Sequence, residues 1–317
     1  MKEIPNNINR LLIDTNYDIR LKKQFVYDPR EELDVMHGSS DISDDMSINV
    51  IKGLYHRYPS KVLIFPTEAC FGECRFCFRK HIRKDANLTS DEFDKIVEYI
   101  KTSPQINEVI FSGGDPMTLN NEKLFNMIKR IREISSVKII RIHTRVLTYS
   151  PDRINDEFID FVKENQPLYM VFHINSALEL SDVACEKAIA LRQNGISCYS
   201  QTALLHEVND SYEDMKELFE KLLILQIKPY YLFHPDLVKG NDHFYVTIEK
   251  GIEIYKKLYN NISGLAMPIY LLNIPSGGGH CIMDLNNISK ISDGYYKVTD
   301  WQHVKHYFTE VLLWSTV

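Results

Sequence analysis

The chain has 317 residues, of which 44% are hydrophobic and 25% are charged, and its formal net charge at pH 7 is −6. These values are typical of a soluble globular protein, and the acidic balance argues against a general nucleic-acid binder, which would present a basic face. No apolar run is long enough to cross a bilayer, and the N-terminal residues lack an apolar signal core. We therefore expect a cytoplasmic protein that binds neither nucleic acid nor membrane.

The predicted elements form a regular series after a polar beginning. Short helical patterns lie between residues 8 and 21, and the turn formers of residues 38–47 are typical of a surface loop. From Lys61 on, short apolar runs alternate with segments of helical period. The predicted strands are 62–65, 109–111, 137–142, 169–173, 196–205, 229–233 and 267–272. The predicted helices are 90–102, 121–134, 154–164, 181–193, 212–225 and 247–258.

This alternation predicts an α/β fold built from β/α units with parallel strands. About six or seven units are too few for a closed eight-stranded barrel, so we expect a partial, open β/α barrel. A doubly wound open sheet is the alternative, and in both folds the site lies at the carboxyl ends of the strands. The expected divisions are a mostly helical N-terminal extension (1–60), the barrel (61–273) and a C-terminal cover segment (274–317).

A cysteine triplet follows the first predicted strand of this series. Cys70, Cys74 and Cys77 have the spacing C-x3-C-x2-C. Thiolates hold iron–sulfur clusters, and a cubane normally takes four protein ligands, so a triplet leaves one iron open to chelate a small molecule. A structural zinc site usually closes with four ligands, and His81 would have to fold back into the same loop to complete one. The triplet therefore predicts a [4Fe–4S] cluster with an open iron.

The triplet belongs to a series of motifs that resembles the lysine 2,3-aminomutase family of radical SAM enzymes, from about residue 53 to about residue 299. In chain order the motifs are GLYHRYPSKVL, CRFCFRKH, FSGGDP, RIHTRV, FHIN, SQTALLHEVND, KPYYLFHPDLVKG, SGLAMPIY and PSGGGH. The shorter family members, including those that act on an elongation-factor lysine, are the most similar. The resemblance implies a [4Fe–4S] cluster that cleaves S-adenosylmethionine to a 5′-deoxyadenosyl radical, with an electron from a reductant such as flavodoxin or ferredoxin.

The resemblance also implies roles for individual residues. The positions expected to bind S-adenosylmethionine are Phe76, Ser112, Gly113, Gly114, Asp115, His173, Asn175 and Gln201. The positions expected to bind substrate are Arg79, Arg145, Asp236 and Asn273. Among these, Arg79 matches the arginine that grips the substrate carboxylate, and Asp236 matches an acid that holds a distal ammonium. The expected phosphate or anion pocket consists of Arg57, Tyr58 and Lys61.

Two departures from the family pattern limit what can be carried over. His280 occupies the position of the lysine that forms a Schiff base with pyridoxal phosphate, and histidine cannot form that link. Asn273 occupies the position of the second acid at the distal-ammonium site, so one charge that selects a lysine-type side chain is missing.

We therefore expect a radical SAM enzyme that abstracts hydrogen from a small amino-acid-like substrate without lysine-bound pyridoxal phosphate. Dehydrogenation, epimerisation, elimination and rearrangement all stay open, and His280 is the candidate catalytic acid or base because its ordinary pKa is near neutrality. One alternative is a lysine-like 2,3-aminomutase with pyridoxal phosphate held non-covalently. A second is a non-catalytic iron–sulfur regulator. The oligomeric state stays open, a homo-oligomer included.

Overall fold

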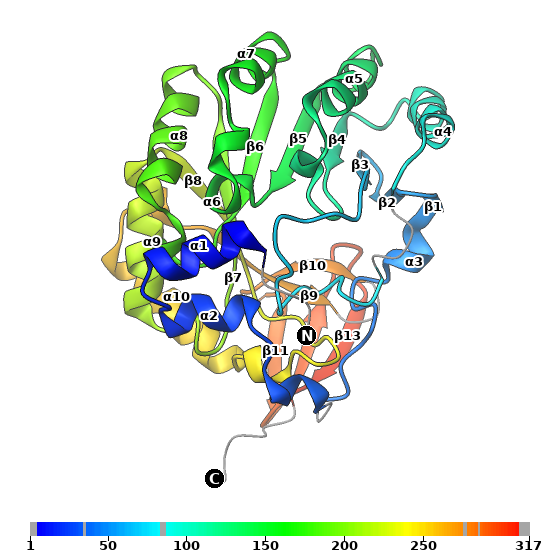
Figure 1. The fold of residues 1–317 in the computed structure, drawn as a ribbon. Coiled ribbons are helices and arrows are strands. Elements are labelled where there is room, and N and C mark those ends of the chain that lie inside the picture. Colours follow the sequence, from blue (N-terminus) through cyan, green and yellow to red (C-terminus); the bar gives the residue numbers. More distant parts are fainter. Residues whose placement is uncertain (1–4, 34–35, 83–86, 275–277, 285, 311–317) are drawn as a thin grey trace.

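The computed structural model describes residues 5–33, 36–82, 87–274, 278–284 and 286–310, and it is organised around one large sheet (Figure 1). This ten-stranded sheet follows chain order from its first strand to its last. Its strands are β1 (Asn49–Ile51), β2 (Leu54–Tyr58), β3 (Lys61–Ile64), β4 (Glu108–Phe111), β5 (Ile139–Thr144), β6 (Leu168–His173), β7 (Cys198–Ala203), β8 (Ile227–Phe233), β9 (Ile269–Ile274) and β10 (Gly279–Ile282). The strands from β3 to β9 pair in parallel, whereas β1, β2 and β10 are antiparallel at the two edges.

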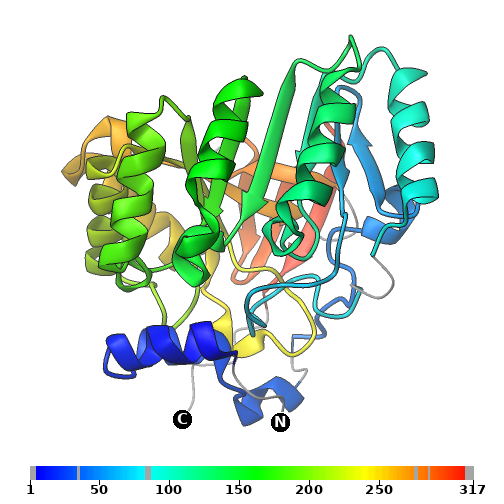
Figure 2. The same ribbon diagram turned by 45° about the horizontal axis from the view of Figure 1, so that its top comes forward.

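Helices connect the parallel strands and cover the outer face of the sheet (Figures 1 and 2). They are α4 (Ser90–Lys101), α5 (Asn121–Arg132), α6 (Val146–Tyr149), α7 (Asp156–Glu164), α8 (Asp182–Gln193), α9 (Tyr212–Ile224) and α10 (Ile248–Asn261). The 3-10 turns are η1 (Pro29–Glu32), η2 (Pro116–Thr118), η3 (Pro151–Arg153), η4 (Ala177–Glu179), η5 (Asp242–Phe244) and η6 (Gly264–Ala266). The longer helices begin at polar residues whose side chains accept a backbone N–H, as Thr89 does for α4 and Ser181 for α8.

The predicted partial β/α barrel is confirmed, together with every strand and helix expected between residues 61 and 274. The doubly wound alternative is wrong, because the strand order runs from β3 to β9 without a reversal. Helix α4 illustrates why these elements can be predicted from the sequence. Its apolar residues Phe93, Ile96, Val97 and Ile100 are all buried against the sheet. Burying one such side chain contributes about 1.5–3 kcal/mol, so the helical period fixes which face packs inward.

Two helices of the N-terminal extension dock on the barrel as a separate apolar unit. They are α1 (Asn6–Asp14) and α2 (Ile19–Phe25), where the sequence predicted short helices. Their buried residues pack with Tyr149 of α6. Phe71 and Cys74 border the same cluster, and both belong to the loop 70–77 that carries the three cysteines (the cysteine loop). The extension therefore lies against the loop that carries the cysteines.

The segment 38–47, expected to be a surface loop, is exposed at several residues, but two of its side chains are buried in the protein. Asp45 is only 3% exposed and Ile42 only 2%. The Ser39 amide donates to the Leu237 carbonyl (2.9 Å) in a parallel bridge with the chain that follows β8. Turn formers suit this segment because it bends beside the chain that follows β8. It leads into the short helix α3 (Asp45–Ile48).

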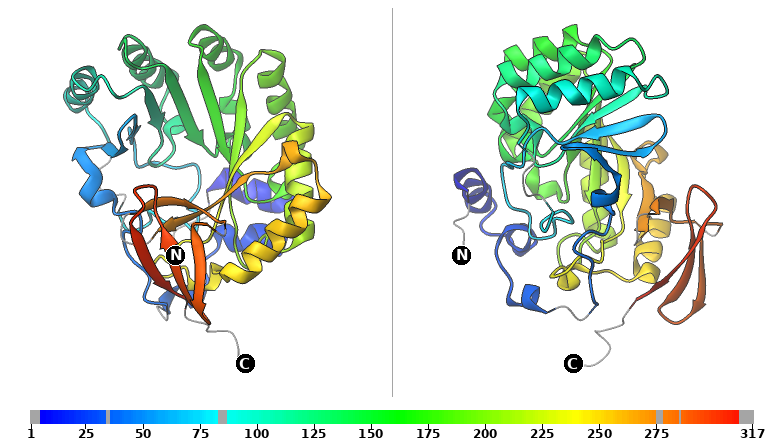
Figure 3. Two further views of the ribbon diagram at one scale, coloured as in Figure 1. Left: turned by 180° about the vertical axis from the view of Figure 1, so that it is seen from behind. Right: turned by 90° about the vertical axis from the view of Figure 1, so that its right-hand side faces the viewer.

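A second, three-stranded sheet lies on the side of the barrel opposite α1 and α2 (Figure 3). Its strands are β11 (Ile288–Ser292), β12 (Tyr295–Thr299) and β13 (Lys305–Thr309). The Glu310 carboxylate accepts the Tyr245 hydroxyl (2.6 Å) and the Ile248 amide (2.7 Å), which ties this sheet to the start of α10. The division at residues 60/61 and 273/274 stays a prediction. Among the described helices, none is long and apolar enough to cross a membrane.

Candidate active site

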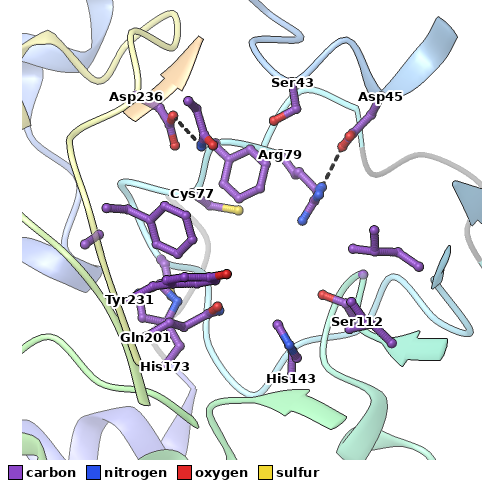
Figure 4. Close-up of a pocket in the computed structure, with 18 of the residues that line it drawn as sticks. Ser43, Asp45, Cys77, Arg79, Ser112, His143, His173, Gln201, Tyr231 and Asp236 are labelled. Atoms are coloured by element: carbon purple, nitrogen blue, oxygen red, sulfur yellow. Dashed lines mark hydrogen bonds and ion pairs between the residues drawn. The ribbon is translucent and has the colours of Figure 1, made fainter. Parts of the chain in front are cut away.

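A cavity of about 290 Å³ opens at the carboxyl edge of the parallel strands (Figure 4). It lies between the cysteine loop and residues 43–48 of the N-terminal extension. Nearly all residues selected from the sequence line it. They are Arg57, Tyr58, Lys61, Cys70, Cys74, Phe76, Cys77, Arg79, Ser112, Gly113, Gly114, Asp115, Arg145, His173, Gln201, Asp236, Asn273 and His280. Asn175 is fully buried behind this lining. The strand ends thus bring distant motifs together as the barrel geometry requires.

The Gly113–Gly114 turn packs directly against the start of the cysteine loop. Gly113 has a φ of +105°, and a Cβ on Gly114 would lie 2.3 Å from the Ala69 carbonyl oxygen. The Gly114 amide donates to the Thr67 carbonyl (3.0 Å), so the two backbones touch. Side chains at these positions would push the cysteine loop away from β4. The glycines therefore have a structural task here in addition to lining the cavity.

Arg145 joins the cysteine loop to a buried polar network. Its guanidinium donates to Cys74 Sγ (2.8 Å) and to Glu179 Oε2 (2.8 Å), and it lies 4.1 Å from the centre of the Tyr149 ring. Gln24 of α2 donates to Glu179 (3.2 Å). Burial raises the pKa of the Cys74 thiol, and the Arg145 charge opposes that shift. Arg145 is thus held at the cysteine end of the cavity.

The cysteine loop provides donors of the kind that an iron–sulfur cluster needs. All three thiols border the cavity, and none forms a disulfide. Within the described ranges, no three His, Cys, Asp or Glu side chains gather around one point as ligands of a single ion would. A cubane makes a different demand, because each thiolate binds a separate iron. Cys70, Cys74 and Cys77 therefore fit a cluster held along one wall.

The strand ends of β6 and β7 place polar side chains beside the loop. His173 pairs with Gln201 in the parallel ladder, and its Nε2 contacts Asn175 Oδ1 at 3.0 Å. Phe76 packs edge-to-face on the His173 ring at 5.6 Å. Burial and the Arg145 charge lower the pKa of His173 to about 3, so the ring is neutral. Asn175 thus orients His173 from behind, while His173 and Gln201 face the cavity.

The Asp115 carboxylate already has several partners inside the protein. It accepts the Thr144 hydroxyl (2.7 Å), the Arg145 amide (2.8 Å) and the Met117 amide (3.0 Å). Burial raises the pKa of this carboxyl to about 6 despite those donors. Its visible work is to join the glycine turn to the end of β5.

The other end of the cavity carries two polar pairs. Arg79 Nε donates to Asp45 Oδ2 (2.6 Å), and Asn273 Nδ2 donates to Asp236 Oδ1 (2.8 Å). Figure 4 shows Arg79 between Asp45 and Asp236. Burial raises the pKa of Asp236 to about 6, while the Asn273 amide and the Arg79 charge oppose that shift.

A cluster of cations surrounds His280 on β10. The His280 amide donates to the Tyr58 hydroxyl (3.1 Å), and the Lys61 ammonium lies 4.5 Å from the centre of the Tyr58 ring. The His280 ring is exposed to the cavity, but protein atoms surround it at longer range. This burial and the charges of Lys61, Arg57, Arg79 and Arg141 lower its pKa to about 4. His280 is therefore neutral at pH 7.

Several residues at the site escaped the sequence analysis. Asp45 lies in a segment whose turn formers predict a surface loop, and Gln24 and Glu179 lie just outside the predicted helices, in α2 and η4. His143 and Arg141 line the cavity from β5. Both belong to the motif RIHTRV, and polar residues alternate with buried apolar ones along that strand, but neither residue was given a role.

Known proteins match both the sequence and the fold. The radical SAM superfamily matches residues 64–222. A putative L-lysine 2,3-aminomutase of Aquifex aeolicus is 40% identical over 243 residues, which are 76% of this chain and 66% of the relative. Glutamate 2,3-aminomutase of Clostridioides difficile is 31% identical over 307 residues, which are 95% of this chain and 68% of the relative. Streptococcus suis SuiB bound to S-adenosylmethionine shares the fold, with a TM-score of 0.51 and 15% identity over 68% of this chain and 51% of that chain.

An open β/α barrel with three thiols at its carboxyl edge and this superfamily match defines the radical SAM class. Within it, the chain belongs to the lysine 2,3-aminomutase family. Membership implies a [4Fe–4S] cluster and S-adenosylmethionine. The matches span 64–66% of the length of three curated relatives, which are lysine 2,3-aminomutases of Aquifex aeolicus, Acetoanaerobium sticklandii and Fusobacterium nucleatum.

Proposed function

We propose that this protein abstracts a hydrogen atom from a small amino-acid-like substrate that is not linked to a lysine-bound pyridoxal phosphate. Bound at the cysteine loop, a cluster and S-adenosylmethionine would supply the electron and the 5′-deoxyadenosyl radical. The chain's own task is to hold the substrate near that source and to exclude water. Dehydrogenation, epimerisation, elimination and rearrangement are the reactions open to the resulting substrate radical.

The observation that carries this proposal is the environment of His280. The ring lines the cavity, burial and the nearby cations lower its pKa to about 4, and in the family pattern its position belongs to the lysine that links the cofactor. A neutral imidazole does not act as an acid at pH 7, and a pKa of about 4 makes it a weak base, so His280 is proposed as a hydrogen-bonding contact or a weak base toward the substrate.

The remaining lining residues support roles in binding. Arg57 and Lys61 offer positive charge to an anionic group, and Arg79 offers it to a carboxylate. Phe76, His173 and Gln201 are proposed to position S-adenosylmethionine, with Asn175 and Asp115 acting through the residues that they orient. Arg145 was expected to bind substrate from the resemblance. Its contacts with Cys74 and Glu179 favour a role in positioning the cysteine loop instead.

The test uses anaerobically reconstituted protein, incubated with S-adenosylmethionine, dithionite and a panel of amino acids, with and without pyridoxal phosphate. We expect one amino acid to stimulate 5′-deoxyadenosine formation without pyridoxal phosphate and to give a product other than a β-amino acid. A strict requirement for pyridoxal phosphate with a β-amino acid product would contradict the proposal and establish an aminomutase. An intact cluster without any 5′-deoxyadenosine would leave either a substrate outside the panel or the non-catalytic regulator.

A second measurement addresses the amine that does line the cavity. Lys61 has no ion-pair or hydrogen-bond acceptor among the described residues, and burial lowers its pKa. Incubation with pyridoxal phosphate, borohydride reduction and peptide mass mapping should therefore include this residue. We expect no adduct on Lys61. A reduced adduct there, absent from Lys61→Met, would show that a lysine in another position had taken over the covalent link and would contradict the proposal.

A further inference from the structure

We propose that Asp45 and Arg79 together form a receptor for the main-chain charges of a free amino acid. In this receptor Arg79 binds the carboxylate and Asp45 binds the α-ammonium. The inference rests on the proposed function for the class of substrate and adds Asp45 as a residue that determines specificity.

The geometry of the pair leaves both charges with unused hydrogen-bonding atoms. Arg79 uses Nε for Asp45 Oδ2 (2.6 Å). Within the described part of the chain, Arg79 Nη1 and Nη2 and Asp45 Oδ1 have no protein partner. Both residues line the cavity, where their side chains are 15% and 4% exposed, respectively. A guanidinium presents its donors as a planar fork that matches a carboxylate, so a ligand carboxylate can take the outer edge without breaking the internal pair.

Both members of the pair are fixed before any ligand arrives. The Arg79 guanidinium lies 4.2 Å from the centre of the Phe78 ring and 4.7 Å from that of Phe65. The Asp41 carboxylate accepts the amides of Asp45 (2.8 Å) and Met46 (2.9 Å), which holds the start of α3. Side chains that are already ordered lose little entropy when they bind a ligand.

The segment of the N-terminal extension that carries Asp45 is hydrogen-bonded to the segment after β8 that carries Asp236. Ser39 bonds to Leu237, the residue after Asp236, and the Lys239 amide donates back to the Ser39 carbonyl (3.2 Å). Asp236 therefore lies at a defined place relative to Asp45, on the other side of Arg79 in Figure 4. A ligand held by Arg79 and Asp45 can direct a side chain toward Asp236 and Asn273.

Charge balance explains why a free amino acid needs Asp45. An amine bonded covalently to a cofactor carries no ordinary ammonium to neutralise. Without a lysine at position 280, the α-amine is expected to enter the cavity protonated, and a desolvated ammonium is costly without a counter-charge. Asp45 provides that counter-charge beside the arginine that takes the carboxylate. If Asp45 served only as the ion-pair partner of Arg79, it would not assist binding. It would instead compete with the ligand carboxylate for the arginine.

The experiment compares binding rather than turnover. Reconstituted protein with S-adenosylmethionine and no reductant is titrated by calorimetry with the twenty standard L-amino acids. The tightest ligand is then compared with its Nα-acetyl and carboxamide derivatives. Asp45→Asn should weaken binding of the free amino acid about tenfold or more, but change binding of the Nα-acetyl form less than about twofold. Arg79→Met should weaken both of these forms and spare the carboxamide.

Asp44→Asn is the matched control, because it removes the same charge one residue away, outside the cavity lining. It should leave all affinities unchanged, and circular dichroism checks the fold of each variant. Tighter binding by Asp45→Asn, equal losses for the free and acetylated ligands, or no binding of any amino acid to the wild type would overturn the receptor. If the binding pattern holds but 5′-deoxyadenosine still requires pyridoxal phosphate, the proposed reaction fails and the receptor stands.

Discussion

The two ends of the cavity are built in different ways. At the cysteine end, Arg145, Glu179, Gln24 and Asn175 are buried and hydrogen-bonded to one another or to Cys74. At the other end, Arg79 and its partner keep hydrogen-bonding atoms free toward the cavity. A network whose members satisfy one another fixes a geometry, whereas unused donors and acceptors bind a ligand. We propose that the first end serves the radical chemistry and that the second end selects the substrate.

The largest expected effect is on the free energy of unfolding, which should differ between variants of Arg145 and Arg79. Arg145→Met leaves the Glu179 carboxylate buried without its cation, and breaking a buried pair typically costs about 3–5 kcal/mol. Arg79→Met should cost less, about 1–3 kcal/mol, because Asp45 lies on the cavity lining and is slightly more exposed than Glu179. Urea unfolding of the metal-free proteins, followed by circular dichroism, measures both values. Equal losses would mean that the two ends are not built differently.

A second prediction concerns Asp236 and pH. Burial raises the pKa of this carboxyl from 3.8 to about 6 in the folded protein, so the folded state keeps a proton that the unfolded chain has released. This group therefore lowers stability as pH rises from about 4 to 6, and the cost persists above pH 6. Asp236→Asn should be more stable than the wild type at pH 7, by at most about 3 kcal/mol, and equal to it below pH 4.

Thermal unfolding midpoints of both proteins across pH 3.5–8 provide the measurement. The asparagine keeps an oxygen that can accept the Asn273 amide, so the pair itself is preserved. A constant difference between wild type and variant at all pH values would assign the effect to packing and not to ionisation.

The smallest expected effect concerns His280. Burial is the main cause of its low pKa of about 4, and Lys61 is the strongest of the nearby charges. Lys61→Met should raise that pKa, but not to the ordinary value of 6.5, because burial persists. Histidine ring resonances followed by NMR through the titration give the value, with His280→Gln for assignment. Lys52→Met, which removes an exposed cation paired with Glu92, should leave it unchanged.

The barrel could be predicted from the sequence because its pattern is local. The apolar period of α4 and the short run of β4 each identify an element within a few residues, and parallel pairing then gathers the strand ends at one edge. The cysteine spacing and the ordered motifs placed most of the cavity lining. Asn175 is fully buried and contacts His173, and its expected contact with S-adenosylmethionine stays a prediction.

The place of Asp45 in the cavity lining could not be predicted from the sequence, because it depends on contacts between segments far apart in the chain. Asp45 follows a segment in which Ser39 bridges to the chain after β8, nearly two hundred residues away, and no local pattern encodes that pairing. Strands β1 and β2 were missed for a related reason. Their residues are partly exposed and lack a clear alternation.

The N-terminal extension has a consequence for how the protein can be divided. Gln24 and Asp45 lie within one short stretch, yet they serve opposite ends of the cavity, and Arg75 of the cysteine loop donates its amide to the Gln24 carbonyl (2.8 Å). A fragment trimmed to residues 64–222 would keep all three cysteines and the superfamily match, but it would lack both of these walls. The segment that the superfamily match covers is therefore smaller than the unit that folds around the cavity, and domain transplantation should move the extension together with the barrel.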